Sequence, residues 1–222
     1  MAKYMIHAVP SRMWYVEQYL IPSMLAQGIS DADIKVHCDY AKEKNLLACV
    51  HAFQEVDMSA LGTWHLQDDV IISHDFKEIT EKYDDGFVCG FSSMYDGDMP
   101  SGVVSVQRMW FSFPCIRIPN TIAKGCADWI LKYIIGNIVY KDWWETGVND
   151  DMLFRQYVWQ HYSFERARNL EPNIVDHVDY LIGGTVNSSK RGVIVRSTRW
   201  ADEYLVEQLQ KELENKNALY GR

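Results

Sequence analysis

The chain has 222 residues, of which 48% are hydrophobic and 23% charged, and its formal net charge is −8. This length fits one large domain better than two small ones, and the composition excludes a disordered protein. The negative charge argues against a surface that is basic overall, although a local basic patch stays compatible with it.

Cysteine usage and the lack of long apolar runs bear on the compartment. The five cysteines are an odd number, and none has the spacing of a metal finger. Reduced, mostly buried thiols in a cytosolic setting are the simplest interpretation. The first residues lack the apolar region of a signal peptide, and no stretch approaches the roughly 20 apolar residues of a membrane span. We therefore expect a soluble cytoplasmic protein without a membrane anchor.

The first hundred residues alternate strand and helix patterns. Strands are expected at 4–9, 34–38, 64–66, 70–72 and 86–91, and helices at 13–28, 42–56 and 75–83. Pro22 should kink or split the first helix. This alternation is typical of βαβ units, so we expect an α/β protein with a mainly parallel central sheet flanked by helices. In such sheets ligands bind at the carboxyl ends of the strands.

The pattern is less regular after residue 97. We expect strands at 103–113 and 115–118 and helices at 120–135 and 150–161, followed by an amphipathic helix at 200–213. No internal repeat, linker or low-complexity segment interrupts the chain. The elements are consistent with one domain over residues 1–222.

An adjacent pair of aspartates, Asp68 and Asp69, separates two strand-like runs in GTWHLQDDVIISHDF. Neighbouring carboxylates repel each other and lose hydration when buried, so a bound cation would explain their position. Carboxylate oxygens suit Mg²⁺ or Mn²⁺, which can hold the phosphates of a nucleotide. A surface turn is the alternative, because aspartates are common there.

This order of elements, with LQDDV after an early strand, resembles the nucleotide-binding half of a GT-A glycosyltransferase, a Rossmann-related fold. The resemblance implies a nucleotide-sugar-binding half at 1–100, an acceptor-binding half at 101–190, and a basic lid with a C-terminal helix at 191–222. Small anchorless versions look like those encoded by bacteriophages or within bacterial polysaccharide clusters.

The resemblance implies a metal site at the aspartate pair. The family has an Asp-x-Asp signature, and Gln67 stands where its first Asp would be. Asp69 is then the metal ligand and Asp68 a second ligand or a sugar contact. The late segment PNIVDHVDYLIGGTVNS resembles an element whose histidine, here His177, returns to the metal; a histidine satisfied in the core is the alternative. Imidazole with carboxylate favours Mn²⁺ over Mg²⁺.

A third match, GVNDDMLFRQYV, contains a second aspartate pair. An acidic residue in a similar place deprotonates the acceptor hydroxyl in inverting members of the family. Asp151 is our first choice for this base and Asp150 our second, since Asp150 is better placed to cap the helix. Helix capping alone would also explain both carboxylates.

Other residues follow from the same resemblance. Pro10, Ser11 and Arg12 should line the nucleotide pocket, and Asp39 resembles the aspartate that reads uracil or ribose. Arg191 belongs to a basic group that could stabilise the departing diphosphate as a lid or could form a solvated loop. The other members of that group are Lys190, Arg196 and Arg199. Four tryptophans could stack on an acceptor or belong to the core, namely Trp110, Trp143, Trp144 and Trp159.

The sequence thus predicts a metal-dependent, inverting glycosyltransferase that takes a sugar from a nucleotide diphosphate donor, with UDP as the nucleotide, to a hydroxyl acceptor. The acceptor could be a glycan, a lipid-linked saccharide or a hydroxymethylated pyrimidine in DNA. Arg166, Arg168 and the basic residues after 190 favour DNA, whereas the net charge opposes it. A nucleotidyltransferase and a non-enzymatic binding module are further alternatives. The transferred sugar and the oligomeric state stay open.

Overall fold

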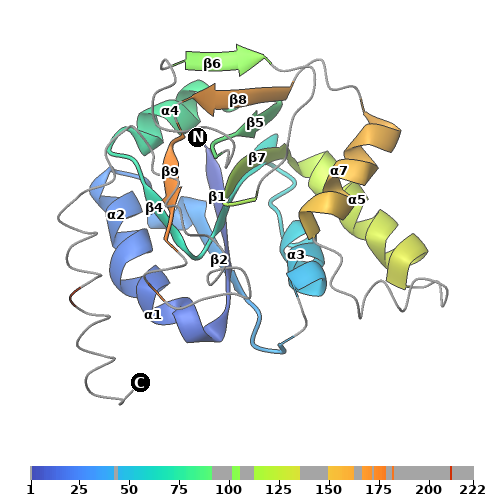
Figure 1. The fold of residues 1–222 in the computed structure, drawn as a ribbon, viewed down its shortest axis with the longest axis horizontal. Coiled ribbons are helices and arrows are strands. Elements are labelled where there is room, and N and C mark those ends of the chain that lie inside the picture. The colour runs from blue at the N-terminus through green and yellow to red at the C-terminus, as the bar shows by residue number, and fades with distance from the viewer. Residues whose placement is uncertain are drawn as a thin grey trace.

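The protein is described here by a computed structural model that covers residues 2–42, 45–91, 102–105, 113–135, 150–162, 167–171, 173–178, 182 and 211. Strands lie in the middle of the molecule and helices on both sides of them (Figure 1). The strands are β1 (Lys3–Ala8), β2 (Ile34–Cys38), β3 (Gly62–Gln67), β4 (Val70–Ile72), β5 (Phe87–Cys89), β6 (Gly102–Ser105), β7 (Cys115–Pro119), β8 (Ala167–Glu171) and β9 (Val175–His177). The helices are α1 (Met13–Tyr15), α2 (Ile21–Ala26), α3 (Asn45–Gln54), α4 (Phe76–Lys82), α5 (Asn120–Trp129) and α7 (Asp150–His161).

Among the described residues, the main sheet has seven strands in the order β2-β1-β3-β7-β5-β8-β6. Pairings β2–β1, β1–β3 and β5–β8 are parallel, whereas β7 and β6 pair antiparallel with their neighbours. Five of the seven strands therefore run in one direction. The predicted α/β class with a mostly parallel sheet is confirmed, but the sheet is mixed, because β7 runs against both of its neighbours.

A second, smaller sheet pairs β4 with β9. The pairing is antiparallel, with Val70 opposite His177 and Ile72 opposite Val175. It continues past the strand end, because the Val178 N–H donates to the Asp69 carbonyl at 2.7 Å. This sheet brings the late part of the chain beside the residues that follow β3.

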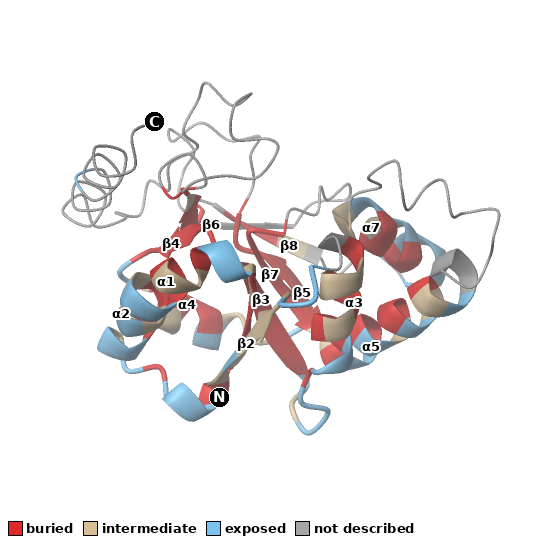
Figure 2. Ribbon diagram, turned by 90° about the horizontal axis from the view of Figure 1, so that it is seen from below, coloured by how far each residue is buried: buried red, intermediate tan, exposed pale blue. Residues whose placement is uncertain are grey.

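Each face of the main sheet is covered by helices. Helices α1, α2 and α4 lie on one side, and α3, α5 and α7 lie on the other (Figure 2). One core contains Tyr4, Ile6 and Trp64 with residues of the first helices, and the other contains Phe53, Phe87 and Phe154. This arrangement follows from the alternation of side chains along each strand, which supplies apolar residues to both faces.

Most predicted elements are present. The predicted 34–38 strand and 150–161 helix match β2 and α7, and the first helix is broken by a π-helical turn, Val16–Leu20, just before Pro22. Residues 130–135 are likewise a π-helical turn that follows α5. The sequence patterns did not predict β8 or β9 as strands. The helix expected at 200–213 and most of the strand expected at 103–113 lie outside the described residues.

The cysteines agree with the expectation of reduced thiols. All five are free, and four of them are buried: Cys49, Cys89, Cys115 and Cys126. Within the described part of the chain, no helix is both long enough and apolar enough to cross a membrane.

Candidate functional site

The carboxyl ends of β1, β2 and β3 lie side by side and carry polar residues. His7 on β1 is in register with His37 on β2 and Gln67 on β3, so the segments that follow these strands begin at one edge of the sheet. Asp39 follows β2, and its N–H donates to the Ala8 carbonyl at 2.9 Å. The aspartate pair follows β3. Strand order thus gathers three segments that are far apart in the sequence.

Asp68 and Asp69 are buried, with 1% and 2% of their surfaces exposed. The Val9 N–H donates to Asp68 Oδ2 at 2.7 Å. Arg12, which is itself only 7% exposed, lies against both carboxylates. Its Nη2 is 2.5 Å from Asp68 Oδ1, and its Nη1 donates to Asp69 Oδ2 at 2.8 Å. The guanidinium of Arg12 therefore supplies positive charge beside both carboxylates. Because both aspartates are buried, they do not form a surface turn.

The two carboxyl groups differ in acidity. Burial raises the pKa of Asp68 to about 6, because Arg12 and the Val9 N–H offset only part of the lost hydration and Asp69 adds like-charge repulsion. Burial also acts to raise the pKa of Asp69, but His177 and Arg12 outweigh it and hold that pKa below its usual value. Asp69 is therefore the more firmly ionised member of the pair.

His177 reaches Asp69 from the far end of the chain. The antiparallel β4–β9 register places it opposite Val70, the residue after Asp69. Its Nε2 lies 3.1 Å from Asp69 Oδ1, and its ring packs 6.0 Å from that of Phe91, measured between centroids. The structure thus brings together the two residues that the sequence nominated as metal ligands, and their role as ligands stays a prediction.

Asp69 and His177 have the donor atoms and the spacing of two ligands of one divalent ion, whose other ligands would have to come from a substrate or water. Among the described residues, no group of three or more His, Cys, Asp or Glu side chains could hold an ion alone. Asp69 Oδ1 faces His177 Nε2, while Asp69 Oδ2 accepts from Arg12. The 3.1 Å separation of Asp69 Oδ1 from His177 Nε2 is close to the ~3.0 Å between two ligands set at right angles, each about 2.1 Å from one ion. Ions such as Mg²⁺ commonly combine one or two carboxylates with substrate phosphates and water.

The other predicted donor-site residues occupy the same edge. Pro10, Ser11 and Arg12 form a 3₁₀ turn directly after β1, in which Pro10 and Ser11 are exposed and Arg12 points inward. The Arg12 N–H donates to the Val9 carbonyl at 3.0 Å, which closes this turn. Asp39 is half-buried beside it. Arg191 and the other basic residues of the predicted lid lie outside the described residues.

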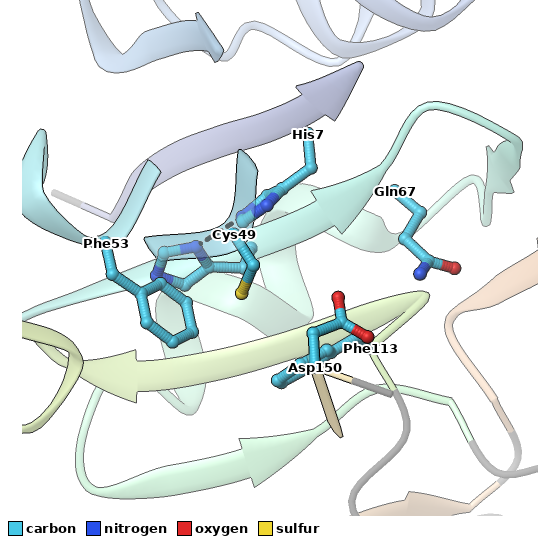
Figure 3. Close-up of a pocket in the computed structure, with 7 residues that line it drawn as sticks. His7, Cys49, Phe53, Gln67, Phe113 and Asp150 are labelled. Carbon is cyan, nitrogen blue, oxygen red and sulfur yellow. Dashed lines mark hydrogen bonds between the residues drawn. The ribbon is translucent and has the colours of Figure 1, made fainter. Parts of the chain in front are cut away.

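A small pocket opens on the other face of the sheet, between β1, β3, α3 and α7. Figure 3 shows Asp150, Cys49 and Gln67 pointing into one space. The free space is about 30 Å³, enough for a water molecule or a hydroxyl group. Its lining consists of His7, Cys49, Phe53, His65, Gln67, Phe113 and Asp150. Gln67 directly precedes Asp68, so this pocket adjoins the aspartate cluster.

Asp150 is the member of the second aspartate pair that lines this pocket. Burial raises its pKa to about 7, and the neighbouring charge of Asp151 adds to the rise. The Asp151 N–H donates to Asp150 Oδ1 at 3.0 Å. Burial also raises the pKa of Asp151, while the Met152 N–H and Arg155 oppose it. The sequence ranked Asp151 first as the base, but the structure places Asp150 in the pocket.

Some features of the site were not predicted from the sequence. The histidines His7 and His65 lie side by side, with 2.8 Å between His7 Nε2 and His65 Nδ1, and burial lowers the pKa of His7 to about 3. Alternation along β1 and β3 could have shown that His7, His65 and Gln67 share a face. Arg168, a candidate for a DNA-binding face, pairs with Asp85 and lies over the Tyr83 ring.

The aromatic candidates are described only in part. Trp159 is 55% exposed on α7 and packs against Arg155, whose guanidinium carbon lies 4.3 Å from the ring centroid. Trp159 is thus not a core residue, in contrast to the buried Trp64. Trp110, Trp143 and Trp144 lie outside the described residues.

The chain matches no protein-family model, and no curated protein sequence matches it.

Proposed function

We propose that the protein is a glycosyltransferase that moves a sugar from a nucleotide diphosphate donor, with UDP as the nucleotide, to a hydroxyl acceptor. One observation carries the proposal: His177 lies 3.1 Å from Asp69 although more than a hundred residues separate them. The resemblance to GT-A glycosyltransferases implies this convergence of an aspartate after a strand with a late histidine. Arg12 and Asp39 at the neighbouring strand ends support the same donor site.

On the donor side, each residue has a separate task. Asp39 and the Pro10–Arg12 turn bind the nucleoside at the ends of β1 and β2. Asp69 and His177 would hold a divalent ion, Mn²⁺ or Mg²⁺, which would supply positive charge at the departing diphosphate. Asp68 fixes the start of the β1 turn by accepting the Val9 N–H. Asp69 remains ionised because His177 and Arg12 keep its pKa low.

On the acceptor side, Asp150 takes the proton of the attacking hydroxyl. A general base works best when its pKa lies near the operating pH, and the pKa of Asp150 is about 7. The pocket around it is lined by Cys49, Phe53 and Phe113, which keep the carboxylate poorly hydrated. Gln67 links this pocket to the donor site. The acceptor itself, a saccharide or a base in DNA, stays open, and paired Arg168 does not favour DNA.

The donor site is tested by melting temperature in the presence of nucleoside diphosphates. UDP with Mn²⁺ should stabilise the protein by about 3 kcal/mol at a hundredfold excess over Kd, and EDTA should remove the effect. Asp69→Asn should abolish the part of the stabilisation by UDP that depends on Mn²⁺. GDP, ADP and CDP serve as a specificity panel.

The matched control is Asp33→Asn. Asp33 is also a largely buried, ion-paired aspartate, with Lys3 Nζ 2.6 Å from its Oδ1, but it precedes β2 and so lies at the opposite edge of the sheet. This variant should keep the full response to UDP and Mn²⁺. If no nucleoside diphosphate raises the melting temperature of the wild-type protein with Mn²⁺ present, the proposed donor site is wrong.

A further inference from the structure

The guanidinium of Arg12 is held between two carboxylates. Nη2 lies 2.5 Å from Asp68 Oδ1 and Nη1 lies 2.8 Å from Asp69 Oδ2, so one side chain bridges both members of the pair. The side chain is 7% exposed, and the turn Pro10–Arg12 that presents it is closed by the bond from the Arg12 N–H to the Val9 carbonyl. Arg12 is therefore a built-in counter-ion of the aspartate pair.

The charges at this site are only partly balanced. Two ionised carboxylates carry two negative charges, and Arg12 supplies one positive charge. A divalent ion at Asp69 and His177 would leave a surplus of positive charge beside a buried guanidinium, since like charges at such short range repel strongly. A diphosphate would remove that surplus.

Arg12 also retains an unused donor. Its Nε is buried and has no hydrogen-bond partner among the described residues. A buried N–H without an acceptor is costly, and guanidinium groups bind phosphate oxygens well. Together with the surplus of positive charge that a bound divalent ion would create, this donor points to an anion as the ligand that completes the site.

We propose that Arg12 competes with the divalent ion for the negative charge of Asp69 and turns to the diphosphate of the donor when ion and nucleotide bind together. This inference rests on the proposed donor site. Its consequence is that the ion binds weakly by itself, because Arg12 already neutralises the carboxylate it needs. Nucleotide and ion then strengthen each other's binding, since the diphosphate gives Arg12 another partner.

The test is the affinity for Mn²⁺ alone and in the presence of UDP, measured by calorimetry on the full chain. In the wild-type protein, UDP should tighten Mn²⁺ binding by about tenfold or more. In Arg12→Gln, Mn²⁺ alone should bind about tenfold more tightly than to the wild type, because the competing charge is gone. The enhancement by UDP should shrink in the same variant. Arg12→Lys keeps the charge and should keep the weak binding of the ion.

Arg12→Gln leaves two buried carboxylates without their cation, so a second pair of variants protects the test against misfolding. Asp68→Asn leaves Arg12 facing Asp69 alone, and Arg12→Gln/Asp68→Asn leaves Asp69 without Arg12. Mn²⁺ should bind more tightly to the double variant than to Asp68→Asn. Equal or weaker binding to the protein without Arg12 in both comparisons would overturn the inference.

These outcomes separate the inference from the proposed function. If UDP with Mn²⁺ binds the wild type but removal of Arg12 does not tighten Mn²⁺ binding, the competition is wrong and the donor site stands. If no nucleoside diphosphate binds with Mn²⁺, the donor site fails. In that case, tighter Mn²⁺ binding to the variants that lack Arg12 would support the competition between Arg12 and the ion. It would overturn the second part of the inference, in which Arg12 binds the diphosphate.

Discussion

Two adjacent aspartate pairs, Asp68–Asp69 and Asp150–Asp151, occur in this chain in contrasting surroundings. The first pair is buried at the end of β3 against Arg12 and His177. The second begins α7, and its pocket member Asp150 faces Cys49 and two phenylalanines. The pKa of Asp69 is lowered by its contacts with His177 and Arg12, whereas burial raises that of Asp150 to about 7.

The contrast shows how one residue type can serve two tasks. A carboxylate whose pKa is held low by its neighbours stays ionised, which suits the coordination of a metal ion. A carboxyl group whose pKa is raised by burial to about 7 suits proton transfer near neutral pH. The sequence motif is Asp-Asp in both places, so the surrounding fold decides the chemistry.

The largest effect should come from removing the base. Asp150→Asn should lower turnover by about 10²–10⁴-fold, because the amide keeps the size of the side chain but cannot accept the proton. Steady-state cleavage of a UDP-sugar, with water or an identified hydroxyl compound as acceptor, measures this loss, and donor affinity should be nearly unchanged. Asp151→Asn is the matched control and should lose less than about tenfold. A larger loss in Asp151→Asn would return the role of base to Asp151.

A stability measurement tests the ionic half of the comparison. Arg12→Met should lower the free energy of unfolding by about 3–5 kcal/mol, because it leaves Asp68 and Asp69 buried without their cation. Chemical denaturation measures the change. The same substitution beside the second pair, Arg155→Met, should cost at most about 1 kcal/mol, since Arg155 is half-buried and lies over the exposed ring of Trp159. Equal losses in both variants would remove the distinction between the two regions.

The smallest effect should be a pH dependence that distinguishes the pocket. The pKa of Asp150 in the folded protein, about 7, lies above the unfolded value, so the folded state binds this proton more tightly. Its contribution to stability is full below pH ~4 and is lost as pH rises toward the folded pKa. Asp150→Asn lacks this titration. The free energy of unfolding of the variant minus that of the wild type should therefore be about 1–2 kcal/mol larger near pH 8 than near pH 5. Unfolding curves at both pH values measure it, and parallel profiles would contradict a raised pKa.

Local patterns were sufficient for most of the fold. Alternating apolar runs, turn residues and Pro22 predicted the strands and helices of the first hundred residues, and the helix that begins at Asp150 matches α7. Strands β8 and β9 were missed because their sequences, ARNLE and VDH, are short and polar. Such strands are stabilised by partners distant in sequence rather than by their own propensity.

The candidate site shows the same division. The sequence nominated Asp69 and His177 from motifs, and it nominated Arg12 as a residue of the nucleotide pocket. It also contained an unused signal: Asp150 stands three, four and seven residues before Leu153, Phe154 and Tyr157, which are buried on one face of α7. That spacing places Asp150 on the inward face of the helix.

The sequence by itself determined the α/β class, the order of most elements and the residue types available for chemistry, because these depend on local periodicity and turn residues. Only the tertiary structure decided that Arg12 forms ion pairs with both Asp68 and Asp69. It likewise decided that β9 places His177 beside Asp69. It also decided that Asp150 rather than Asp151 lines the pocket. Those outcomes depend on strand order, register and burial, which are set by contacts between residues far apart in the chain.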